Sequence, residues 1–203
     1  MPGKLVYYNV NGRAECIRAL LGHANYEYDD TRPDDVRQLP EVFASNKMGG
    51  WPIWIEDDYI MYQSNAILRM LAIRLGYYTT DPDVAYSIDS ICDFIEDVVD
   101  IYFEYPLPKV AFHKPLGDAD AWIAKFWDKL LPVLDARLAA HGKKFIAGTD
   151  RPTMADFKAS IFWGITFQDV KGEENLYSDE VLGKIRAKAE AFPHYLRWSE
   201  AMM

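Results

Sequence analysis

The pattern of this chain changes near residue 80, and that change limits the folds it can adopt more than any other feature. Before this point, short strand-like segments alternate with helical ones; beyond it, only helical periodicity is found. Alternation predicts a sheet layered with helices, whereas a run of helices predicts a helical layer of its own. We therefore predict an α+β chain of two domains, with an α/β domain at 1–77, a linker at 78–83 and an all-α domain at 84–203.

The first half has the order strand, helix, strand, helix, strand, strand, helix. Apolar residues at i, i+3, i+4 and i+7 mark the first helix, and Asn25 suits a left-handed position after it. The predicted segments are a strand at 4–8, a helix around 17–24, a strand at 26–29, a weak helix at 34–45 interrupted by Pro40, strands at 53–56 and 59–62, and a helix capped by Ser64 and stopped by Gly76. This order predicts a mixed four-stranded sheet of the thioredoxin-like type.

The second half contains helical segments only. We predict helices at 84–102, 118–141, 153–169, 178–190 and 193–202, the second of them bent at Pro132. Thr153 and Asp156 have the spacing of a capping box, in which each side chain satisfies a backbone N–H at the start of a helix. The role of this pair is therefore expected to be structural.

Composition excludes several classes of function. The net charge of −9 disfavours nucleic acid and anionic membranes as partners. No apolar run reaches the roughly 18 residues needed to cross a bilayer, and the first residues lack a signal-peptide pattern, so we expect a cytoplasmic protein. Cys16 and Cys92 fall in helical patterns and are expected to be buried thiols. No metal-ligand spacing occurs among the Cys and His residues, so no metal is expected.

Four motifs carry a family resemblance that spans the whole chain. They are Tyr7-Tyr8-Asn9-x-x-Gly12-Arg13-Ala14-Glu15, Pro52 eleven residues before Gln63, the segment Gln63-Ser64-Asn65-Ala66-Ile67-Leu68-Arg69, and Phe145-Ile146-x-Gly148 followed by Thr153-Met154-Ala155-Asp156-Phe157. Together they resemble the cytosolic glutathione transferases, the sigma class above all, with mu-like and alpha-like features. The resemblance implies a homodimer that uses glutathione as co-substrate and joins its thiolate to hydrophobic electrophiles.

The chemistry that the resemblance implies needs a proton donor beside the thiol. A thiol with a pKa of about 8.5 is only a few per cent ionised at pH 7. A hydrogen bond from a tyrosine hydroxyl favours the thiolate, and a fall of about two units in the pKa corresponds to about 2.7 kcal/mol. The resemblance places this hydroxyl at Tyr7, the first residue of the pair, while Tyr8 faces the electrophile.

The resemblance also implies the other contacts. The glutathione-binding set is Tyr7, Arg13, Leu39, Lys47, Gly50, Trp51, Pro52, Gln63, Ser64 and, across a dimer interface, Asp93. Pro52 is expected to be cis, which would leave the Trp51 backbone free to pair with the cysteinyl unit; a proline that starts an edge strand is the alternative. Candidate lining residues of an electrophile pocket between the domains are Tyr8, Ile95, Val99 and Tyr102, and core packing explains the last three equally well.

Three positions depart from the family pattern. Leu39 and Phe43 stand where the family has a Trp and a Lys that contact the glycine end of glutathione, and Gly50 replaces a further Lys; Lys47 is a candidate substitute. These departures favour a rival hypothesis, a non-catalytic ligand-binding or crystallin-like protein of the same fold. A glutathione-dependent isomerase of the prostaglandin D synthase kind is a third. For Asp93, which shares a helix face with Asp89 and Asp97, a solvated acidic surface is the alternative to a binding role.

Overall fold

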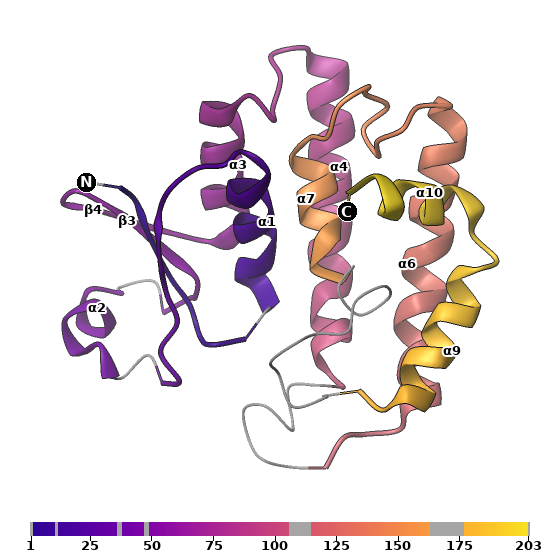
Figure 1. The fold of residues 1–203 in the computed structure, drawn as a ribbon, viewed down its shortest axis with the longest axis horizontal. Coiled ribbons are helices and arrows are strands. Elements are labelled where there is room, and N and C mark those ends of the chain that lie inside the picture. Colours follow the sequence, from indigo (N-terminus) through magenta and orange to yellow (C-terminus); the bar gives the residue numbers. More distant parts are fainter. Residues whose placement is uncertain are drawn as a thin grey trace. The chain divides into compact units, whose positions relative to one another are not determined.

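The chain divides into two compact units, Met1–Thr79 and Thr80–Met203 (Figure 1). The computed structural model describes residues 2–10, 12–35, 38–46, 49–105, 115–162 and 177–202, without the side chains of Phe43 and Ser45.

The first unit is built on the mixed four-stranded sheet that the sequence predicts. Its strands are β1 (Lys4–Val6), β2 (Asp29–Thr31), β3 (Ile53–Glu56) and β4 (Tyr59–Tyr62), in the order β2-β1-β3-β4. β1 is parallel to β2 and antiparallel to β3, and β3 forms an antiparallel hairpin with β4. The helical segments are η1 (Gly12–Ala14), α1 (Glu15–His23), α2 (Pro40–Ser45) and α3 (Ser64–Leu75). α1 and α3 pack together beside the sheet, whereas α2 lies apart from them (Figure 1).

Several predicted boundaries in this unit are wrong. The first strand, predicted at 4–8, ends at Val6. The second strand begins at Asp29 and not at Tyr26, because the end of α1 continues as a turn in which the Tyr26 N–H donates to the Leu21 carbonyl. The expected left-handed residue at Asn25, with φ of 50°, lies in that turn. Pro40 does not interrupt a helix at 34–45 but begins α2. A proline suits the first turn of a helix, where its missing N–H would have no partner.

The start of α3 also differs from the prediction. Ser64 is the first helical residue and not the cap; Gln63 occupies the cap position with φ of 71° and ψ of 109°, and its side chain caps no N–H. A positive φ is uncommon for a residue with a side chain. The far end of α3 agrees with the prediction, since Gly76 terminates it in a left-handed conformation.

In its described residues the second unit contains helices and no strand. The helices are α4 (Pro82–Phe103), α6 (Ala119–His141), α7 (Met154–Ala159), the 3-10 helix η3 (Ser160–Phe162), α9 (Asp179–Ala189) and α10 (Pro193–Met202). α4 and α6 lie side by side, α7 packs on α4, and α9 and α10 pack on α6 (Figure 1). Pro82 and Asp83, which were predicted to be linker, form the first turn of α4, capped by Asp81. The helix predicted at 153–169 changes to 3-10 geometry at Ser160, and its residues after 162 lie outside the described part.

Asp156 shows how the second unit is held together. This carboxylate is fully buried and accepts four hydrogen bonds, from the Thr153 N–H and hydroxyl, the Ile146 N–H and the Trp198 indole N–H. The capping box predicted for Thr153 and Asp156 is therefore present and extends to α10. Burial raises the pKa of Asp156, and the four donors act against that rise.

Candidate active site

The register of the sheet brings the predicted motifs of the first unit together. Val6 pairs with Ile53, and Ile53 pairs with Tyr62 on its other side. The next residue along each chain is therefore Tyr7 after β1, Pro52 before β3 and Gln63 after β4. All three lie just beyond the same end of the sheet, although up to 56 positions separate them in the sequence. Ends of strands are positions where loops can hold functional groups on a rigid support.

Tyr7 is the buried centre of this end of the sheet. Its side chain is 8% exposed, and its hydroxyl oxygen accepts a hydrogen bond from the Arg13 backbone N–H at 3.2 Å. Among the described residues this is its one hydrogen bond, and its own O–H donates to none of them. Burial raises the pKa of Tyr7, although the Arg13 N–H and the charges of Arg13 and Arg18 act to lower it. The phenol therefore remains protonated at neutral pH with its proton available to a ligand.

The short helix η1 lets Tyr7 and Arg13 approach each other. Gly12 has φ of 65°, and a Cβ atom there would lie 2.7 Å from the Tyr7 hydroxyl oxygen. A side chain at this position would thus displace the hydroxyl as well as strain the backbone. Arg13 contacts Tyr7 through its backbone N–H, and this contact does not test the binding role predicted for the Arg13 side chain.

Tyr8 and Trp51 extend the site along the sheet edge. The Tyr8 ring meets the Tyr7 ring edge to face at a centroid distance of 5.6 Å, and it meets the Trp51 ring in the same way at 6.3 Å. The bond between Trp51 and Pro52 is cis, as predicted. These contacts place Tyr8 between the candidate donor and the segment expected to bind the peptide backbone of a ligand.

Gln63 and Gly50 lie near each other at the same edge. A Cβ atom at Gly50 would be 4.0 Å from the Gln63 side-chain nitrogen. Ser64 is buried and opens α3, whose first backbone hydrogen bond runs from the Ile67 N–H to the Gln63 carbonyl. The N–H groups ahead of Ile67 in this first turn thus precede the helical hydrogen-bond series, which is the arrangement that binds anions at helix N-termini.

Sequence reasoning missed two residues at this end of the unit. Asn46 holds the loop before Trp51, since its amide donates to the Gly50 carbonyl at 2.9 Å and its side-chain oxygen accepts from the Gly49 N–H at 3.0 Å. Arg18 is 6% exposed, and its guanidinium carbon lies 5.8 Å from the centroid of the Tyr7 ring. A signal for Arg18 existed, because it follows Ala14 at i+4 on the face of α1 that also carries the buried Leu21.

The remaining predicted site residues are Leu39 and Lys47 in the first unit and four residues of α4 in the second unit. Leu39 is partly exposed, and Lys47 lies outside the described residues. Asp93, Ile95, Val99 and Tyr102 are on α4 in the second unit. Asp93 is exposed, whereas Ile95 and Val99 are fully buried. The Tyr102 ring packs against the rings of Phe126 and Phe162, at centroid distances of 5.3 and 5.0 Å.

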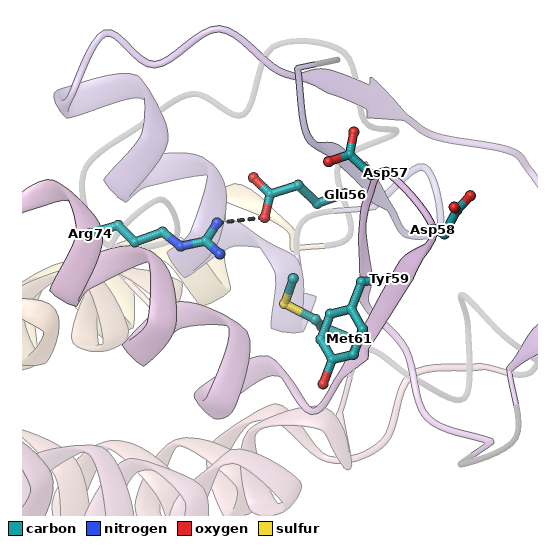
Figure 2. A pocket seen from close by; sticks show the side chains of 6 residues that line it. All are labelled: Glu56, Asp57, Asp58, Tyr59, Met61 and Arg74. Carbon is teal, nitrogen blue, oxygen red and sulfur yellow. Dashed lines mark hydrogen bonds and ion pairs between the residues drawn. The ribbon is translucent and has the colours of Figure 1, made fainter.

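A hollow at the other end of the β3–β4 hairpin is separate from this group. It is lined by Glu56, Asp57, Asp58, Tyr59, Met61 and Arg74 (Figure 2). Arg74 and Glu56 form an ion pair at 2.5 Å across it. Asp57 and Asp58 are the turn of the hairpin, the end opposite to Pro52 and Gln63, so the hollow does not belong to the candidate site.

Comparison with known proteins agrees with this architecture. Residues 3–72 match the family model of the glutathione S-transferase N-terminal domain. The chain is 31% identical to glutathione S-transferase P 1 of Xenopus laevis over 77% of its own length and 74% of that relative. It is 29% identical to haematopoietic prostaglandin D synthase of Gallus gallus over 98% of its length and 96% of that protein. It also shares the fold of the Ascaris lumbricoides glutathione S-transferase, with a TM-score of 0.66 at 23% identity over 100% of this chain and 98% of that one.

The chain belongs to the glutathione S-transferase family. It has the fold of that family, a thioredoxin-like domain with a mixed four-stranded sheet followed by a helical domain. An alpha-3 glutathione S-transferase of Rattus norvegicus matches at the same 31% identity as the P 1 relative. Because relatives of different classes match about equally well, these matches define the family and not the class within it.

Proposed function

We propose that this protein is a glutathione transferase in which the Tyr7 hydroxyl stabilises the thiolate of bound glutathione for attack on hydrophobic electrophiles. The observation that carries the proposal is the state of Tyr7. A buried phenol normally finds a hydrogen-bond partner for its O–H. Here the oxygen accepts from the Arg13 N–H, and no described residue takes the proton. Burial raises the pKa of Tyr7, so the proton stays on the phenol oxygen at neutral pH.

The rest of the sheet end supports a mode of binding for glutathione. The Trp51 backbone, beside cis Pro52, would pair with the cysteinyl unit as an added strand does. The γ-glutamyl carboxylate would lie at the N-terminus of α3, near Gln63 and Ser64, where the helix dipole favours an anion. Asn46 would keep the Gly49–Gly50 loop in place for the glycine end, where the family's usual Trp and Lys donors are absent.

The assembly and the electrophile site are further parts of this proposal. We propose a cytosolic homodimer in which Asp93, exposed on α4, contributes to the glutathione site of the partner subunit. Cys16 and Cys92 are buried thiols that form no disulfide, which suits a reducing compartment. Within the described residues no helix is both long and apolar enough to span a membrane. Of the predicted electrophile contacts, Tyr8 remains our candidate, whereas Ile95 and Val99 are fully buried and Tyr102 is 7% exposed in the second unit. A monomeric mass by light scattering would contradict the dimer.

The decisive experiment compares Tyr7→Phe with Tyr8→Phe in an assay with glutathione and chlorodinitrobenzene. We expect Tyr7→Phe to lower kcat by about a hundredfold, the usual consequence of losing one donor to a developing anion, with little change in glutathione affinity. Tyr8→Phe keeps the ring and the neighbouring contacts and should retain most of the turnover. The reverse ranking would move the catalytic role to Tyr8. Binding of glutathione by calorimetry without any turnover in the parent protein would instead support the non-catalytic ligand-binding role.

A second activity is favoured by one comparison. The relative named haematopoietic prostaglandin D synthase matches over 98% of this chain. A glutathione-dependent isomerisation needs the same thiolate, which is regenerated instead of consumed. The parent protein, incubated with a prostaglandin endoperoxide and glutathione, would show this activity as product formation without net loss of glutathione.

A further inference from the structure

Arg18 is a buried cation beside the candidate catalytic phenol that the proposed mechanism leaves unused. Its side chain projects from α1 and is 6% exposed, which is rare for a charged residue unless it is paired. One of its guanidinium nitrogens, Nη2, is buried and has no partner among the described residues. A buried donor in this state costs free energy, so its retention calls for a physical role.

The hydrogen bonds of Arg18 join the segments that surround Tyr7. Nη1 donates to the Val10 carbonyl at 3.0 Å, in the turn that follows Tyr7 and Tyr8. Nε donates to the Asp30 carboxylate of β2 at 3.3 Å, and Nη1 also contacts Glu15 at 3.3 Å. A single side chain therefore connects α1, the turn after β1 and the neighbouring parallel strand.

The charge of Arg18 acts on Tyr7 directly. The guanidinium carbon is 5.8 Å from the Tyr7 ring centroid, within the range of a cation–π contact. Among the described residues, the charged groups that act on Tyr7 or on Arg18 are Arg13 on η1, Glu15 on α1 and Asp30 on β2. Arg32, which follows β2, forms an ion pair with Asp30. Arg13 and Arg18 lower the pKa of Tyr7, whereas Tyr8 and burial raise it. Without Arg18, the Asp30 and Glu15 carboxylates would lose one of their compensating charges.

We propose that Arg18 is a positioning residue for thiolate formation, which fixes the turn that carries Tyr7 and supplies positive potential to the Tyr7 end of the sheet. This inference rests on the proposed function, because it concerns the anion that Tyr7 stabilises. It goes beyond that function by assigning a role to a side chain that need not touch the ligand. If Arg18 has this role, a positive charge near the Tyr7 ring favours ionisation of the bound thiol, and loss of that charge disfavours it.

Two variants of opposite charge effect test the proposal. Arg18→Met removes the cation, and Asp30→Asn removes an anion from the same network while it keeps an oxygen acceptor. Arg18→Lys retains the charge without the forked geometry. Arg74→Met is the matched control, since Arg74 is an arginine of the same unit with an ion pair to Glu56 at the opposite end of the hairpin (Figure 2). The readouts are the ultraviolet absorption of the thiolate of bound glutathione against pH, and kcat and KM across the same pH range.

We expect Arg18→Met to shift the titration of the bound thiol and the pH profile of kcat upward by about one pH unit. As a result, kcat would fall about tenfold at neutral pH and recover at high pH. Asp30→Asn should displace them downward, by less, because Arg32 shares the Asp30 charge. Arg18→Lys should recover part of the loss, and Arg74→Met should leave the profile in place. The KM for glutathione should change little in any of these variants.

Three results separate the possible failures. If Tyr7→Phe keeps full turnover, the proposed function fails, whatever Arg18 does. If Tyr7→Phe loses turnover but neither Arg18→Lys nor Asp30→Asn shifts the thiol titration, the positioning role of Arg18 is overturned. If Arg18→Met and Asp30→Asn lower kcat equally at every pH, Arg18 is structural only. Thermal unfolding of each variant identifies those that fold, and Asp30→Asn and Arg18→Lys carry the test if Arg18→Met does not.

Discussion

Tyr7 in the sheet unit and Asp156 in the helical unit are both buried ionisable groups, yet their hydrogen-bonding capacity is used in opposite ways. Tyr7 is 8% exposed and Asp156 is 0% exposed, and burial raises the pKa of each. Asp156 accepts four hydrogen bonds from its own unit. Tyr7 accepts one, and its proton goes to no described residue.

This difference is consistent with a structural role for Asp156 and with the ligand-binding role proposed for Tyr7. A carboxylate surrounded by four donors has no capacity left for another partner, so its contacts stabilise the helical unit. A buried phenol whose O–H donates to none of the residues that the structure describes has an unused donor, which a ligand acceptor would satisfy. Three predictions test the contrast, in addition to the variants of Tyr7 and Arg18 described above.

The largest expected effect is that of Asp156→Ala on stability. The change leaves the Ile146 and Thr153 N–H groups and the Trp198 indole without their acceptor. We expect the free energy of unfolding to fall by about 3–5 kcal/mol, measured by urea denaturation with tryptophan fluorescence. Asp150→Ala is the control, because the Asp150 side chain is 84% exposed and its pair with Lys143 should contribute at most about 1 kcal/mol. If both variants lost the same free energy of unfolding, the structural role assigned to Asp156 would be wrong.

An intermediate effect, on turnover more than on stability, is expected for Gly12→Ala. The new Cβ atom would lie 2.7 Å from the Tyr7 hydroxyl oxygen and must move it. We expect kcat to fall by roughly tenfold to a hundredfold, as misplacement of a catalytic group does. The positive φ of 65° adds about 1 kcal/mol of strain. Gly22→Ala in α1 meets no atom within 4 Å and should preserve kcat. Full activity in Gly12→Ala would show that the exact place of the hydroxyl is unimportant.

The smallest effect is expected at the hollow of the hairpin turn. Glu56 and Arg74 form a partly exposed ion pair there, with side-chain exposures of 23% and 49% (Figure 2). We expect Glu56→Gln to change the free energy of unfolding by at most about 1 kcal/mol, and the change should shrink further in high salt. Turnover should equal that of the parent protein in the same assay. A large loss of turnover would extend the functional region of the unit to this end of the sheet.

Much of the fold could be predicted because its signals are local. Both strands of the β3–β4 hairpin have the predicted bounds, and the α10 segment does too. Gly76 and the Thr153–Asp156 capping box mark helix ends through side chains that act within a few residues. The second strand was misplaced because its bounds depend on pairing with β1, a contact between segments about 25 residues apart.

The candidate site was predicted in part, since its motifs are recognisable and its distances are not. Tyr7, Pro52 and Gln63 were singled out by the residues around them, but Ser64 was given the cap position that Gln63 occupies. Asn46 was missed although its partners, Gly49 and Gly50, are only three and four residues away. Arg18 was missed because it donates to the Val10 carbonyl and to the Asp30 carboxylate of another strand. Such partners are set by tertiary packing and leave little trace in a single sequence.

The sequence alone determined the two-part architecture and the family resemblance, because periodicity, turn residues and motif spacing are local properties of the chain. It also gave Tyr7 as the candidate phenol. Only the tertiary structure decided that the Arg13 N–H binds the Tyr7 oxygen, that the phenol O–H donates to no residue of the described ranges, and that Arg18 lies near the ring. The physical reason is that the hydrogen bonds and the electrostatic potential at a buried group depend on distances of a few ångströms. The register of the sheet and the packing of α1 set these distances together.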